Sequence, residues 1–144
     1  KPEFMVIDVG AGAESSSMSF MTSANKVVVV ITGEPTSWTD SYALIKAAYL
    51  DYKMDNFGII VNMSHSLQAK LYFDKFQSVV HRFVGVSPQY IGYVPPSKKI
   101  KNSIISRSPI MSNNDNSEEA KAFNNLSTHL LTLNNNKTDG IKFF

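Results

Sequence analysis

The sequence predicts an α/β fold in which a mostly parallel sheet is flanked by helices. The first observation is a set of short apolar runs, at residues 4–9, 26–32, 57–62 and 89–94. The first three lack strict alternation with polar residues, as expected for strands that are buried on both faces of a parallel sheet. The second observation is that helical stretches separate these runs, which is the βαβ rhythm of α/β proteins.

The helix after the second run has the clearest periodicity. Its large side chains recur at the 3.6-residue period and form one face: Trp38, Tyr42, Ile45, Tyr49 and Tyr52. We expect this helix to begin near Ser37, with Ser37 as the cap and Asp40 as the acid of a capping box. Trp38, Tyr42 and Tyr49 are interpreted as core rather than as a ligand platform. Further helices are expected at about 67–83, 98–106 and 117–133.

The composition of the 144 residues limits the possible functions. Hydrophobic residues make up 43% and charged residues 18%, the balance of a globular domain. The net charge of +2 gives no bulk electrostatic argument for nucleic-acid binding. Without cysteine, the chain has no disulfides, thiolate metal sites or cysteine nucleophiles. The three histidines, His65, His81 and His129, lack metal-ligand spacing and are interpreted as surface or polar-network residues.

The first apolar run ends in a group of residues that could carry chemistry. Asp8 closes the expected strand, and Gly10 and Gly12 follow it in a turn. A carboxylate at the carboxyl end of a parallel strand faces the crevice where α/β proteins bind ligands, and it can hold Mg²⁺ there through water. Glycines let backbone amides approach a phosphate. Taken alone, the pattern is equally explained by a strand that ends in a polar turn.

Several segments, in order, resemble later motifs of the MinD/ParA class of P-loop ATPases. VIDVGAG at 6–12 is similar to the Walker B strand and switch II turn of that class, and IIVNM at 59–63 to the strand that carries an adenine-reading asparagine. YIGYVP at 90–95 resembles the strand that enters a Gly-x-x-Pro base-contacting loop. The most specific match is EPTSWTDSYALIK at 34–46, which is similar to a helix of the FlhG type within this class.

The resemblance assigns roles to individual residues. Asp8 would hold Mg²⁺ through water, and Gly10 and Gly12 would form switch II. Asn62 would read the adenine of ATP or ADP, and Pro95 would belong to the base loop. The implied protein is an ATP-dependent homodimer in the cytoplasm that regulates flagellar number or placement together with flagellar assembly proteins. GIKFF at 140–144 resembles the start of a helix that targets the inner face of the cytoplasmic membrane.

Two parts of the class pattern do not occur in this sequence. It contains no Gly-Lys-rich phosphate loop, and the acid of switch I would precede Lys1. Without these groups a phosphate is neither positioned nor stabilised during transfer, so we expect no ATP hydrolysis by this chain alone. We expect it to be a portion of a longer protein, with a partial nucleotide-binding domain at 1–133 and a linker and helix start at 134–144. Without the phosphate-loop strand, the strand at 4–9 should have an unpaired edge, and the chain should self-associate.

Two other functions remain open on the sequence. A ParA-like ATPase could position another cargo with the same class of fold. A binding module that has lost its phosphate loop could retain the fold without catalysis. The flagellar type is favoured by the 34–46 segment and by the residues at 140–144.

Overall fold

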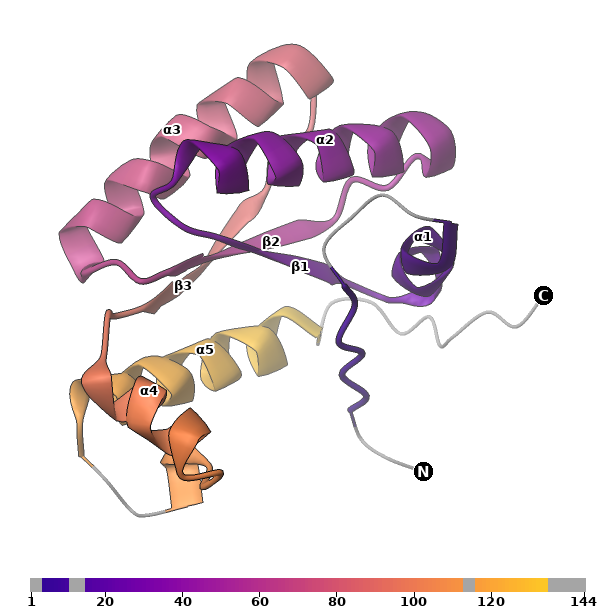
Figure 1. The fold of residues 1–144 in the computed structure, drawn as a ribbon. Coiled ribbons are helices and arrows are strands. Elements are labelled where there is room, and N and C mark those ends of the chain that lie inside the picture. Colours follow the sequence, from indigo (N-terminus) through magenta and orange to yellow (C-terminus); the bar gives the residue numbers. More distant parts are fainter. Residues whose placement is uncertain (1–3, 11–14, 113–115, 135–144) are drawn as a thin grey trace.

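A computed structural model describes residues 4–10, 15–112 and 116–134 of the chain. Helices and strands alternate along it (Figure 1). In chain order they are α1 (Ser15–Ser23), β1 (Val27–Ile31), α2 (Pro35–Tyr52), β2 (Phe57–Asn62), α3 (Ser66–Val84), β3 (Gln89–Val94), α4 (Lys98–Ile105), the 3-10 turn η1 (Ile110–Ser112) and α5 (Glu118–Asn134).

The three strands form one parallel sheet in the order β1-β2-β3. Each strand pairs with the next one along the chain, and a helix makes each crossover, because parallel neighbours cannot be joined by a tight turn. The predicted α/β class with a parallel sheet is confirmed. Among the described residues, no helix is long and apolar enough to cross a membrane.

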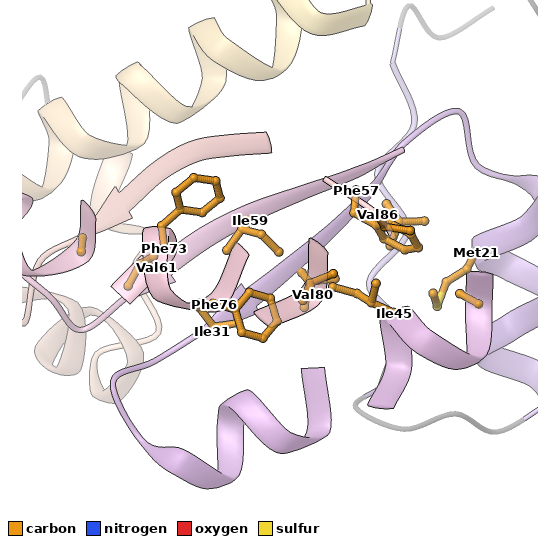
Figure 2. Packing of buried hydrophobic residues seen from close by; sticks show 14 of the residues in the cluster. Met21, Ile31, Ile45, Phe57, Ile59, Val61, Phe73, Phe76, Val80 and Val86 are labelled. Atoms are coloured by element: carbon orange, nitrogen blue, oxygen red, sulfur yellow. The ribbon is translucent and has the colours of Figure 1, made fainter. Parts of the chain in front are cut away.

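Helices cover both faces of the sheet (Figure 1). α2 and α3 pack on one face, where Ile31, Ile59 and Val61 are fully buried against Ile45 and other apolar side chains (Figure 2). α5 packs on the opposite face, over β3. A smaller cluster there joins strand and helix residues, namely Ile91, Val94 and Leu126.

β3 contains an irregularity that lets its side chains pack on both faces of the sheet. Ile59 pairs with Tyr90 and Ile60 with Gly92, so Ile91 is skipped in the register. Its carbonyl oxygen instead lies 2.7 Å from Nδ1 of His129 on α5, which donates a hydrogen bond to it. The bulge therefore ties β3 to the helix beneath it.

The predicted strand at 4–9 is not formed. Residues 4–10 have no regular structure, and the apolar side chains of this segment are exposed, with Val6 at 94% and Met5 at 62%. A strand is stable only when a neighbour completes its hydrogen bonds, and the strand that the resemblance places beside this segment is missing from the sequence. The local apolar pattern was therefore insufficient to make it a strand.

The predicted capping box of α2 is also wrong. The helix begins at Pro35, with Glu34 at the N-cap and no side-chain cap hydrogen bond. Proline is well suited to the first helical position because it has no N–H to satisfy and its φ is already helical. Ser37 lies inside the helix and accepts a hydrogen bond from the backbone N–H of Thr32 at 3.0 Å, while Asp40 is exposed.

The other three predicted helices were found within one residue at each end, as α3, α4 and α5. The histidines lie at the surface or in polar contacts, as expected: His81 with Ser87, His65 near Glu118, and His129 with Ile91. Within residues 4–10, 15–112 and 116–134, no group of three or more His, Asp or Glu side chains could hold a metal ion.

Candidate functional site at the carboxyl ends of the strands

The turn after β2 is fixed by hydrogen bonds to itself and to the end of β3. The side-chain oxygen of Asn62 accepts a hydrogen bond from the backbone N–H of Met63 at 2.9 Å. Met63 has a φ of 56°, in the left-handed region, so the chain turns sharply here. The buried Ser64 donates its backbone N–H to the carbonyl oxygen of Val94 at 3.2 Å. Asn62 is therefore held in a defined turn at the sheet edge.

The turn after β3 lies beside the turn after β2. Asn62 pairs with Val94 in the sheet, so the buried Pro95 follows directly on the neighbouring strand. The structure thus brings together the two residues that the sequence assigns to the base. Because Oδ1 of Asn62 is used within the turn, its Nδ2 group is the part of the side chain that remains to donate to a ligand.

Ser97 anchors the turn after Pro95 to two helices. Its side-chain oxygen accepts hydrogen bonds from the backbone N–H groups of Lys99 and Ile100, which caps α4. The same hydroxyl donates to Oε1 of Glu119 on α5. This hydrogen bond is the main reason that the pKa of Glu119 lies below its ordinary value.

The turn after β1 completes this edge of the sheet. Trp38 donates its ring N–H to the carbonyl oxygen of Thr32 at 2.7 Å. Gly33 packs closely against the ring of Tyr72, and a Cβ at this position would lie 2.6 Å from it. The rings of Trp38 and Tyr72 are also nearly perpendicular, in a T-shaped contact with centroids 5.9 Å apart. Trp38, Tyr42 and Tyr49 pack against the core, as the sequence predicted, and Trp38 also supports the turn after β1. Tyr52, at the end of the predicted face, is instead 50% exposed.

The residues assigned to magnesium and switch II are not joined to this edge by any hydrogen bond or ion pair that the described residues show. Asp8 is exposed in the irregular segment 4–10, and a Cβ added at Gly10 would meet nothing within 4 Å. Gly12 lies outside the described residues. One carboxylate does not make a magnesium site, so Asp8 would need ligands from water, phosphate or other protein groups.

The residues present fit one part of a nucleotide better than the others. An amide donor on Asn62 and the backbone around Pro95 suit the edge of a base. A phosphate would have no lysine-bearing loop to hold it in this sequence. Two surface hollows, of about 230 and 160 Å³, lie away from this edge, beside His81 and Asn56 respectively. Both are smaller than the ligand pockets of about 300–1,000 Å³ that are usual in proteins.

The sequence did not single out Ser64, Ser97 or Glu119. Ser97 carried a usable signal, because a serine that precedes a helix is a common N-cap. Ser64 and Glu119 carried none, since their contacts join segments that are far apart in the sequence.

The chain is similar to two curated flagellar proteins. It is 38% identical over 103 residues to the antiactivator FleN of Pseudomonas aeruginosa, a match that covers 71% of this chain and 37% of FleN. It is 25% identical over 107 residues to the flagellum site-determining protein YlxH of Helicobacter pylori, covering 73% of this chain and 36% of YlxH. The matched part is thus little more than a third of the length of these relatives. No family model matches the chain.

Among solved structures, the fold is similar to that of the MinD cell division protein of Aquifex aeolicus. The TM-score is 0.62 at 16% sequence identity, and the match covers 91% of this chain and 52% of that protein. The parallel sheet, the order of motifs and the two flagellar relatives lead to one assignment. The chain is related in sequence to FleN and YlxH and has the fold of MinD, and together these findings support a relationship to the MinD/ParA class of proteins.

Proposed function

We propose that this chain is the base-reading part of an ATP-dependent switch protein that regulates the number or placement of flagella. The observation that carries the proposal is the pairing of Asn62 with Val94, which places the predicted adenine reader beside Pro95. The names of the two relatives, an antiactivator and a flagellum site-determining protein, support the flagellar role. In this role Asn62 donates its amide to the adenine edge, and the Pro95 turn lies against the base.

The phosphate-binding parts would come from protein sequence that this chain does not contain. A bound Mg²⁺ would neutralise charge on the phosphates, and Asp8 is the residue that would hold it, through water. ATP would favour a homodimer, because contacts to the γ-phosphate can select one state over another. The dimer would act in the cytoplasm at the inner face of the membrane, with residues 140–144 at the start of the membrane-binding helix.

Binding of ATP to the complete protein tests the role of Asn62. Asn62→Ala removes a hydrogen bond to the base and should raise the Kd for ATP about tenfold, as loss of one hydrogen bond of about 1–1.5 kcal/mol would. Fluorescence anisotropy with labelled ATP measures the effect. Asn102→Ala, on the exposed surface of α4, is the matched control and should leave the Kd unchanged. An unchanged Kd for ATP in Asn62→Ala would show that Asn62 does not contact the base.

Two further observations separate the function classes. Deletion of the gene should change the number or placement of flagella, and normal flagellation would favour a switch that positions another cargo. A Gly-Lys-rich loop encoded roughly a hundred codons upstream, the distance at which P-loop motifs precede Walker B, would support the ATPase. A stop codon just before Lys1 would favour a binding module without catalysis.

A further inference from the structure

α3 carries a second apolar face that points away from the core. Its inner face is buried against the sheet and includes Phe73, Phe76 and Val80 (Figure 2). Four further large apolar residues of the helix are exposed: Leu67 to 85%, Leu71 to 60%, Val79 to 42% and Phe83 to 63%. At about 100° per residue, all four fall within roughly 160° of arc, which adjoins the inner face on the Phe83 side. We call these four residues the α3 outer stripe.

The α3 outer stripe is too extensive to be explained as scattered surface residues. It runs for about 24 Å at the usual rise of about 1.5 Å per residue. Single exposed apolar side chains are normal, whereas several on one sector of a helix mark an interaction site. Here two apolar pairs, Leu67 with Leu71 and Val79 with Phe83, lie on either side of Lys75. The α3 outer stripe would also stay uncovered if the sheet were larger. Additional strands could pair with the free edge of β1, which lies on the α2 side of the sheet (Figure 1). They would therefore extend the molecule away from α3.

Two basic residues lie within the same sector of the helix. Lys75 and Arg82 are exposed, and among the described residues neither has a carboxylate within salt-bridge distance. The guanidinium of Arg82 lies 5.4 Å from the ring centre of Phe83. The one acidic residue of α3, Asp74, is already paired with Lys70 at 2.9 Å. The α3 outer stripe is thus apolar with uncompensated positive charge.

The charges favour a partner protein, and not a second copy of this chain, as the molecule that covers the α3 outer stripe. In an antiparallel pair of α3 helices centred on the stripe, Lys75 of one copy would face Lys75 of the other, and like charges repel. Two cations also add little attraction to a membrane surface, at about 1 kcal/mol each. From this geometry we propose that the α3 outer stripe binds an amphipathic helix of a partner protein whose apolar face is flanked by acidic residues. Leu67, Leu71, Val79 and Phe83 pack against that helix, and Lys75 and Arg82 pair with its carboxylates.

The probe is a synthetic helical peptide of about 18 residues, which matches the length of the stripe. Leucines occupy one face and glutamates flank them; a second peptide carries lysines in place of the glutamates. Binding to the purified chain is measured by fluorescence anisotropy. Leu71→Ser should weaken the glutamate peptide about tenfold, because it removes apolar contact area. Lys75→Glu should weaken the glutamate peptide about fivefold and strengthen the lysine peptide, because it reverses one contact charge.

Lys121→Glu on α5 is the matched control, since it changes the net charge equally at an exposed site outside the stripe. Circular dichroism establishes that each variant keeps its helices. Equal affinity for the two peptides, or equal effects of Lys75→Glu and Lys121→Glu, would overturn the proposal. Self-association that Leu71→Ser abolishes would assign the stripe to a second copy instead. Tighter binding to anionic phosphatidylserine vesicles than to the glutamate peptide, lost in Leu71→Ser, would assign it to a membrane.

Discussion

Gly92 determines the local shape of β3 and how closely α5 approaches it. Its φ of 155° is one that side chains rarely adopt, and a Cβ here would lie only 2.7 Å from Cδ2 of Leu126. The position follows Ile91, whose carbonyl oxygen is free to accept from His129 because the register skips it. Glycine thus permits both the bulge and the close approach of α5.

Gly92→Ala should destabilise the fold by about 1–3 kcal/mol, because the added methyl group displaces Leu126 and the backbone is strained. Urea unfolding followed by circular dichroism measures the change. Gly10→Ala is a suitable control, since its Cβ would meet nothing within 4 Å. A loss below about 0.5 kcal/mol, the usual range of surface substitutions, would show that the contact with Leu126 relaxes without cost.

The sequence predicted candidate site residues but not the contacts that surround them. Asn62 and Pro95 were predicted as neighbours in function through the resemblance, and the register places them on adjacent strands. The bulge at Gly92 was not predicted, because a strand of six residues is too short to show a break in alternation. The roles of Asn62 and Pro95, like those of Asp8, Gly10 and Gly12, remain predictions.

Among the elements, α4 depends most on its ends. It has eight residues and none is buried, so packing contributes little to its stability. Ser97 supplies two hydrogen bonds to its first turn and a third contact to Glu119. This cap also fixes the chain that leaves Pro95, which connects the stability of α4 to the candidate site.

Ser97→Ala should destabilise the chain by about 1 kcal/mol through loss of the cap. Urea unfolding near neutral pH measures it, with Ser106→Ala as a control at the exposed other end of the helix. The low pKa of Glu119 means that its hydrogen bond stabilises the fold above the ordinary pKa of 4.5 and is lost as the pH falls through the lowered pKa. The effect of Ser97→Ala should therefore become smaller in acid. An effect that grows in acid would contradict the role of the Glu119 carboxylate.

Helices and strands differed in how well the sequence predicted them. α3, α4 and α5 matched closely because helical hydrogen bonds are local to the segment. The N-cap of α2 lies three residues earlier than predicted, at Glu34 instead of Ser37, because Pro35 is well suited to the first helical position. The segment 4–9 failed because pairing depends on a neighbour, which no local pattern can supply.

At the scale of the whole molecule, β1 is an unprotected edge. Among the described residues it pairs only with β2, and Val30 is 53% exposed. Phe4, Met5 and Val6 add exposed apolar surface in the segment that precedes it. A strand of five β-branched residues with one unpaired edge is a template for pairing with another chain.

The chain alone should therefore self-associate, and Val30→Lys should reduce this, because a lysine on an edge strand opposes further pairing. Analytical ultracentrifugation over a range of concentrations measures the oligomers. Leu50→Lys on α2 introduces the same charge at a residue of nearly equal exposure, 52%, and should change little. A stable monomer in the unsubstituted chain would contradict the prediction.

The order of the strands also has a consequence for how the molecule folds. Each strand lies beside its successor in the sequence, so every pairing closes a loop of only one helix and its turns. Short loops cost less entropy to close and form faster than distant ones. The sheet can grow one βα unit at a time without a strand having to wait for a remote partner. β2, with neighbours on both sides, is the natural nucleus, and the outer edge of β1 is the last place where pairing can be completed.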